Sequence, residues 1–349
     1  MIYTVIVCLT IGFLYILLLR RYDRYEKENF LTLVGACLVG GVIAIILTLI
    51  TASLIYPKDG NQDLELALMV GAVEESAKLL ALFIIYPFIK KELNETVDGI
   101  LYMAMIALGF ALIENIQYVG IYGIEVLLPR SIICNIGHMV FSGFMGLTFY
   151  IHKTNKKNWL GLIAALFFAS LGHTIYDAIL FEKWNTYYAI GVDIIMLLFS
   201  LYCLRISLAF STFKKNFQIK NIEIKGNGNS VLCPQCNDTL IFNKSKFENI
   251  ELELCSGCQN FAQLNHKNSK RLLKYFRPLL RRKKWLKTLQ YDLPKGVLSN
   301  ADTRTLAGKV GPLNDWLIAG NQKDLEKALK RPIIGLFLRV LGLSKLLPA

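Results

Sequence analysis

The sequence predicts an all-α polytopic membrane protein of about seven transmembrane helices, followed by a small β-rich cytoplasmic zinc ribbon. Of its 349 residues, 54% are hydrophobic, the mean hydropathy is +0.42, and the apolar residues are concentrated before residue 214. The charge divides at the same point. Residues 1–213 carry 14 Lys and Arg against 16 Asp and Glu, whereas residues 214–349 carry 25 against 10. We therefore expect residues 1–213 to lie in a membrane and residues 214–349 in water.

Seven apolar stretches are long enough to cross a hydrocarbon core of ~30 Å. They lie near residues 2–19, 30–56, 66–89, 97–120, 131–151, 159–181 and 187–213. No Lys or Arg precedes the first stretch, whereas Arg20 and Arg21 follow it directly, which favours an uncleaved span over a signal peptide. Residues 1–213 are therefore expected to form one transmembrane domain in the cell membrane.

Basic residues recur in alternate loops, which predicts the orientation of the spans. These loops contain Arg20 with Arg21, Lys90 with Lys91, residues 152–157, and Lys214 with Lys215. The positive-inside rule places them in the cytoplasm. An odd number of spans then leaves residues 214–349 in the cytoplasm, where thiols stay reduced.

Ionisable side chains recur inside the predicted spans, where they are costly and usually face the bundle interior. The candidate catalytic residues are Glu74, Glu75, Lys78, Glu114, His138, His173 and Asp177. Five of them lie roughly 6–14 Å below the outer surface, counted from the outer end of each span at ~1.5 Å per helical residue. These are Glu74, Glu114, His138, His173 and Asp177. A shared depth on four spans predicts one polar cavity open to the extracytoplasmic side.

The spacing of these residues favours acid–base chemistry. Glu74 and Glu75 precede Lys78 by four and three residues, so the lysine can reach both carboxylates on one helix. His173 and Asp177 also share a helix face. A packing ion pair or an interhelical hydrogen bond would explain any one of these residues alone. Their conjunction in one layer favours a functional site.

Four successive motifs resemble those of the PrsW family of bacterial intramembrane proteases, which is distantly related to the CAAX-prenyl endopeptidases and the bacteriocin-processing membrane proteases. They are Glu74-Glu75-x-x-Lys78, Phe110-x-x-x-Glu114-Asn115-x-x-Tyr118, Arg130 followed by His138, and His173-x-x-x-Asp177. The resemblance covers about residues 60–185. It implies cleavage of a single-pass, membrane-anchored protein, typically an anti-sigma factor cut on its extracytoplasmic side.

Two mechanisms are compatible with these residues. In the first, Glu75 or Glu74 activates water, and His138 and His173 stabilise the oxyanion without a metal. In the second, His138, His173 and a carboxylate from Glu114, Glu75 or Asp177 hold a divalent metal. The sequence contains no HExxH motif and does not choose between them.

Two CxxC pairs predict a zinc ribbon over residues 226–266. Cys233 and Cys236 are separated by 18 residues from Cys255 and Cys258, a spacing typical of four thiolates around one structural zinc. Such a domain has too small a core to fold alone, so the metal supplies the folding free energy. Four thiolates leave no open position for catalysis.

Residues 267–349 are expected to form a basic, partly helical cytoplasmic tail. Within it, residues 267–287 interleave ten Lys and Arg with apolar side chains. A basic amphipathic segment near a bilayer favours the anionic lipid surface over a protein partner, and nucleic acid is the least favoured of the three. The oligomeric state cannot be read from the sequence.

Two other functions would also place ionisable groups in the membrane. A proton-coupled transporter would use the Glu and His residues as a relay, but it predicts charges along both leaflets and an inverted repeat. A non-catalytic membrane receptor would signal through the ribbon, and its signalling would survive carboxylate-to-amide changes. The common layer of charges and the lack of an evident inverted repeat argue against the transporter, and carboxylate-to-amide changes would distinguish the receptor.

Overall fold

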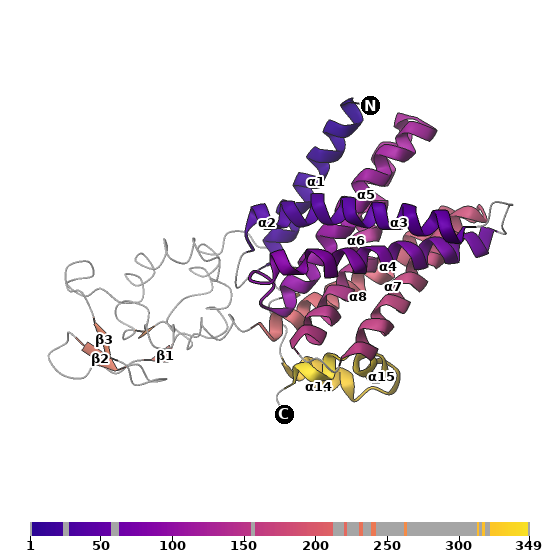
Figure 1. Cartoon of the computed structure of the whole chain (residues 1–349). Helices are drawn as coiled ribbons and strands as arrows, with labels where there is room; N and C mark the ends of the chain where they lie inside the picture. The colour runs from indigo at the N-terminus through magenta and orange to yellow at the C-terminus, as the bar shows by residue number, and fades with distance from the viewer. Residues whose placement is uncertain are drawn as a thin grey trace. The chain divides into compact units, whose positions relative to one another are not determined.

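The computed structural model describes residues 2–23, 28–56, 63–154, 158–211 and 322–347, together with short pieces between residues 220 and 317. The described part of the first 211 residues is built of long helices (Figure 1). These are α1 (Ile2–Tyr22), the continuous run of α2 (Phe30–Gly35), the π-helical turn η1 (Ala36–Gly40) and α3 (Gly41–Ile55), then α4 (Asp63–Ile89), α5 (Thr96–Tyr122), α6 (Leu127–Thr154), α7 (Trp159–Phe181) and α8 (Thr186–Ala209). A 3₁₀ turn, η2 (Ile124–Val126), precedes α6.

Each of the seven predicted apolar stretches forms one of these helices. Among the described residues, six helical stretches are long and apolar enough to cross a membrane. The seventh, α4, is also long enough, with 27 residues, but it is less apolar because it contains Glu74, Glu75 and Lys78. All three side chains are buried, so α4 hides its charges inside the bundle. The last helix ends at Ala209, four residues before the predicted boundary.

Helix α5 lies in the interior of the bundle, and every residue from Thr96 to Leu112 is buried. It crosses α6 where Gly99 meets Gly146, and a Cβ added to Gly146 would lie only 1.8 Å from the Gly99 carbonyl oxygen. Small residues at such crossings let two membrane helices approach closely. This contact fixes α5 and α6, and with them Glu114 and His138, relative to each other.

We expect Gly146→Ala to lower the thermal stability of the purified protein, because the added methyl group has no space and would push α5 away from α6. Overpacking of this kind usually costs about 1–3 kcal/mol. Gly143→Ala is the matched control on the same helix, since its Cβ would meet Ile100 Cγ2 at 3.7 Å, an ordinary contact distance. Thermal unfolding in detergent measures both, and equal melting temperatures would contradict the packing argument.

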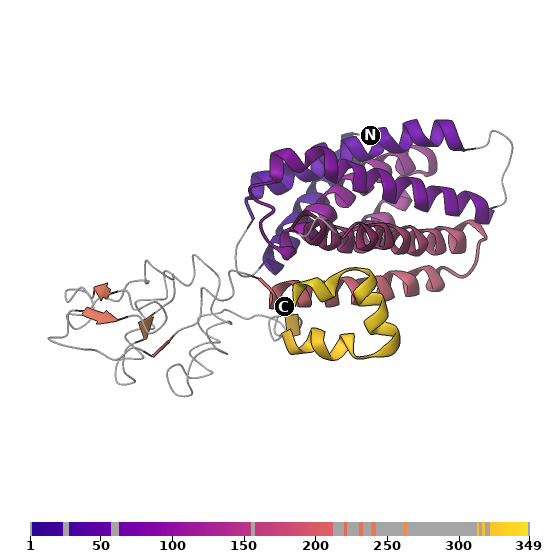
Figure 2. The same cartoon turned by 60° about the horizontal axis from the view of Figure 1, so that its bottom comes forward.

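Two short helices near the C-terminus, α14 (Gln322–Leu329) and α15 (Pro332–Val340), form a hairpin followed by the 3₁₀ turn η4 (Leu343–Leu346). They belong to the same compact unit as the long helices, and α15 contacts α7. Figures 1 and 2 show this hairpin in yellow beside α7 and α8. The tail is thus helical in this part.

A second unit covers residues 208–320, of which only short pieces are described. Its strands β2 (Ser230–Leu232) and β3 (Thr239–Ile241) pair in antiparallel register, with Val231 opposite Leu240. Strands β1 (Lys220–Asn221) and β4 (Ala262–Gln263) pair in parallel. The four cysteines of the predicted ribbon and the basic segment 267–287 lie outside the described residues.

Candidate functional site in the helical bundle

The centre of the site is a buried group of charges on α4. Lys78 is fully buried, and its Nζ lies 2.8 Å from Glu75 Oε1 and 3.4 Å from Glu74 Oε2. The same ammonium lies 4.3 Å from the centre of the Phe110 ring on α5. Because a buried charge is stable only when it is paired, the lysine ties the two carboxylates together.

Glu75 connects three helices. Its carboxylate binds Lys78 on its own helix, accepts a hydrogen bond of 2.6 Å from Ser142 Oγ on α6, and lies 3.0 Å from His173 Nδ1 on α7. No part of the Glu75 side chain is exposed. Its contacts therefore fix the imidazole of His173, whose other nitrogen lies 3.5 Å from Asp177 Oδ2.

His138 on α6 is held between two charged partners. Its Nδ1 lies 3.0 Å from Lys78 Nζ, and its Nε2 lies 2.8 Å from Glu114 Oε2 on α5. Arg130 forms an ion pair of 3.1 Å with the same Glu114 oxygen and stacks its guanidinium 3.5 Å from the centre of the Tyr118 ring. The Arg130–Glu114–His138 chain thus orients this imidazole from the α5–α6 side.

These groups surround a cavity of about 390 Å³. Its ionisable lining comprises Glu74, Glu114, Arg130, His138, His173 and Asp177. Tyr56, Tyr118 and Tyr122 also line it, from the ends of α3 and α5 that adjoin the loops predicted to be extracytoplasmic. Glu75 and Lys78 are not part of the lining. The predicted convergence of charges from several spans is therefore present, but the two adjacent glutamates have different surroundings.

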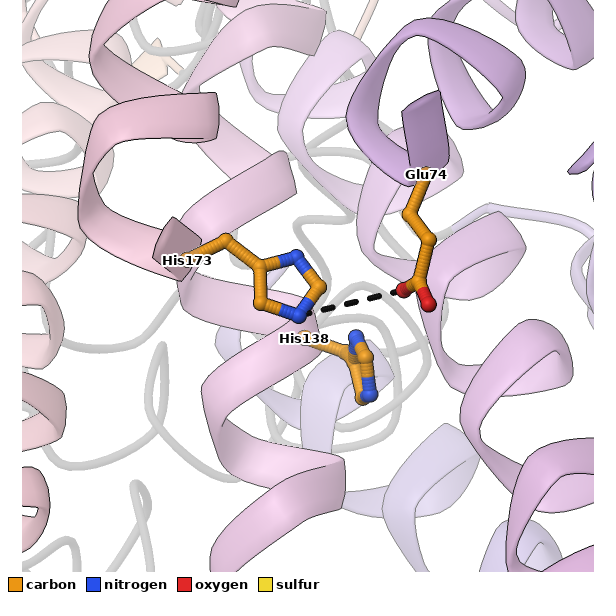
Figure 3. Close-up of side chains that lie close together, drawn as sticks. All are labelled: Glu74, His138 and His173. Carbon is orange, nitrogen blue, oxygen red and sulfur yellow. Dashed lines mark ion pairs between the residues drawn. The ribbon is translucent and has the colours of Figure 1, made fainter. Parts of the chain in front are cut away.

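Three of the lining residues are arranged as a metal-binding group could be. One oxygen of Glu74 and one nitrogen each of His138 and His173 lie within 4.8 Å of one another (Figure 3). Glu74 Oε2 is 3.8 Å from His173 Nε2. A carboxylate with two imidazoles is a common ligand set of catalytic zinc, so the residues fit a divalent metal. Of the three carboxylates that the sequence offered for this role, Glu114, Glu75 and Asp177, Glu114 is the partner of His138 and Arg130.

Sequence reasoning missed several residues that line the cavity, among them Cys134 and Tyr176. Their side chains lie 3.6 Å apart, Sγ to Oη. Cys134 precedes His138 by four residues and Tyr176 follows His173 by three, so helical spacing alone would place them on the same faces. Phe141, also unpredicted, stacks on His173 with ring centroids 5.5 Å apart.

A cavity lined by glutamates and histidines inside a bundle of helices long enough to span a membrane defines a multi-pass membrane protein with a polar site inside the bundle. Comparison with known proteins gives its family. Residues 28–204 match the model of the PrsW family of intramembrane metalloproteases, and the chain belongs to this family. It is an intramembrane protease.

Individual relatives agree. The chain is 28% identical over 199 residues to Protease PrsW of Shouchella clausii, covering 54% of this chain and 89% of that protein. It is 32% identical over 177 residues to Protease PrsW of Geobacillus kaustophilus, covering 47% and 75%, and 32% identical over 181 residues to that of Clostridioides difficile, covering 48% and 74%. No solved structure matches the chain.

Proposed function

We propose that this protease cuts a membrane-anchored protein in the outer part of its membrane span or just outside it, with Glu74 acting on the attacking water. The observation that carries this proposal is the single cavity that Glu74 shares with His138, His173 and Asp177. The family assignment favours this function over the transporter and the receptor. The substrate is a single-pass protein of the anti-sigma-factor type, as the family resemblance implies.

The two glutamates divide the work. Glu74 borders the cavity and can contact a water molecule there. Glu75 lies behind it and holds Lys78 and His173 in place. A carboxylate that is fixed by three partners positions other groups, whereas one that faces the cavity can exchange a proton with water. Asp177, at the cavity wall beside His173, is a second group that can hold a proton.

One cation that lines the cavity and one that contacts its lining residues stabilise the negative charge that develops when water attacks a peptide carbonyl. Lys78 keeps its charge between Glu74, Glu75 and His138. Arg130 lines the cavity and neutralises Glu114. Preorganised charges of this kind need no rearrangement during the reaction, which makes them effective in a site with little water.

A divalent metal would be held by Glu74, His138 and His173. When bound there, it would lower the pKa of a bound water and polarise the substrate carbonyl. Glu75 behind His173 and Glu114 behind His138 would orient the two imidazoles, as carboxylates commonly do for histidine ligands. Both nitrogens of His138 have partners, so His138 would exchange Lys78 for the metal and keep its contact with Glu114.

The position of the cut tests the proposed function. Membrane proteins from cells with wild-type protease and cells with Glu74→Gln are compared, and the released fragment of any protein that accumulates uncut is sequenced by mass spectrometry. We expect a scissile bond in the outer part of the substrate's span or just beyond it. A cut on the cytoplasmic side would contradict the proposal together with the predicted orientation, and identical proteomes would contradict the role of Glu74.

Residues 226–266 are proposed to bind one structural zinc through Cys233, Cys236, Cys255 and Cys258 in the cytoplasm. Antiparallel strands β2 and β3 flank the first cysteine pair in sequence, as a ribbon hairpin would. Residues 267–287 are proposed to contact anionic lipid headgroups.

Counting metal in the purified full-length protein separates the two proposed sites. We expect about two equivalents per chain, one for the four thiolates and one for the membrane site. Cys233→Ser/Cys255→Ser should remove one, His173→Ala the other, and Cys203→Ser, a buried thiol outside both sites, neither. Elemental analysis by mass spectrometry gives the count. Two equivalents in His173→Ala would contradict the proposed ligand set, and a single equivalent in the wild type, lost with the cysteines, would mean that Glu74 acts on water without a metal.

A further inference from the structure

A second cavity, of about 660 Å³, lies between α8 and the α14–α15 hairpin. Most of its lining is apolar. These residues are Leu198, Phe199, Ala328, Ile333, Ile334, Phe337 and Leu338. The polar lining is confined to Tyr202 on α8 and to Asp324, Lys327 and Arg331 on the hairpin. We call this cavity the hairpin cleft. It shares no lining residue with the cavity of the proposed active site.

The hairpin is fixed to the membrane helices at both ends of the cleft. Arg205 on α8 forms an ion pair of 2.8 Å with Asp324 at the start of α14. Phe337 on α15 packs between Phe168 on α7 and Phe199 on α8, with ring centroids 4.5 and 5.4 Å away. The cleft is therefore a defined part of the membrane unit.

The polar part of the cleft carries excess positive charge. Lys327 and Arg331 are exposed there, and neither forms an ion pair with another residue that the structure describes. The carboxylate of Asp324 is the acidic group of the lining and binds Arg205. Two cations thus border an apolar cleft, and an anion attached to a hydrocarbon chain is complementary to this arrangement.

The apolar part continues into the surface that the spans present to lipid. On α8, Ile195 and Leu198 are 67% and 61% exposed, and on α15 Ile333 is 84% exposed. In a multi-pass membrane protein, such side chains of a spanning helix contact acyl chains. Leu198 belongs to both surfaces, because it also lines the cleft. A lipid chain can therefore enter from the bilayer.

We propose that the hairpin cleft binds one anionic phospholipid, with an acyl chain against Leu198 and Phe199 and the phosphate between Lys327 and Arg331. On the orientation predicted from the loop charges, this lipid belongs to the cytoplasmic leaflet. The site is separate from the lipid contact proposed for residues 267–287 and does not depend on the protease mechanism.

Native mass spectrometry of the detergent-purified full-length protein tests the proposal. Phosphatidylglycerol and phosphatidylcholine with the same acyl chains are added in turn, and retained lipid is counted. We expect the wild type to retain one phosphatidylglycerol with a preference on the order of tenfold, since each cation near a headgroup contributes to binding. Lys327→Gln/Arg331→Gln should abolish this preference. Lys323→Gln/Lys330→Gln removes the same charge from the hairpin outside the cleft and should keep it.

The apolar part is tested separately by Leu198→Trp, which fills the cleft from α8 and should reduce retention of both lipids. Three results would overturn the proposal: equal retention of the two lipids by the wild type, unchanged preference in Lys327→Gln/Arg331→Gln, or loss of preference in the control pair alone. Disulfide-linked dimers through a cysteine introduced at Ile334 would show that a second copy of the chain fills the cleft instead, which would also overturn it.

Discussion

Glu74→Gln is expected to lower the rate of substrate cleavage by a factor of about 10²–10⁴, the usual range for loss of an acid–base group. The amide keeps the shape of the side chain but neither takes a proton from water nor binds a metal well. Because Glu74 borders the cavity and Glu75 remains as the 2.8 Å partner of Lys78, the thermal stability should change little. Cleavage of the substrate in membranes and unfolding in detergent measure the two effects.

Glu65→Gln is the matched control, since Glu65 is an exposed carboxylate on the same helix. It should retain full activity. Full activity in Glu74→Gln would show that the cavity is not the active site or that another carboxylate does this work.

Glu75→Gln is expected to lose both activity and stability. Glu75 is fully buried and binds Lys78, Ser142 and His173, so the change leaves the Lys78 ammonium without its nearest counter-ion. Breaking a buried ion pair on one side typically costs about 3–5 kcal/mol. Thermal unfolding in detergent should show a lower melting temperature for Glu75→Gln than for Glu74→Gln.

The double variant Glu75→Gln/Lys78→Met separates the two losses. Methionine removes the unpaired charge and fills a similar volume, so most of the stability should return, while His173 still lacks its fixed partner and cleavage stays low. Recovery of cleavage together with stability would mean that Glu75 acts only on folding.

The sequence predicted the helices well because each is encoded by a long apolar run. Part of the candidate site could also be predicted from the sequence, because the spacing alone places Glu74 with Lys78, and His173 with Asp177, on one helix face. What spacing does not give is direction. Glu74 and Glu75 are neighbours that point about 100° apart on a helix, so only the packing of α4 against α6 and α7 decides which one faces the cavity.

Contacts between residues far apart in the sequence could not be predicted from it either. The 3.0 Å approach of Lys78 to His138 joins residues 60 positions apart, and no local pattern encodes it. The α14–α15 hairpin was expected only as part of a basic tail. Its place beside α8 depends on Phe337 and on the Arg205–Asp324 pair, which act through tertiary packing.

The composition of α4 also bears on how the chain enters the membrane. On insertion scales a charged side chain near the bilayer centre costs about 2.5–3.5 kcal/mol, and α4 carries three charges in five residues. We therefore expect that α4 alone would pass from the translocon into the bilayer inefficiently. Its main packing partner is α7, which begins at Trp159, 70 residues after α4 ends. His173 on α7 is a partner of Glu75 and follows it by 98 residues. We therefore expect α4 to become stable in the bilayer together with the neighbours that complete the site.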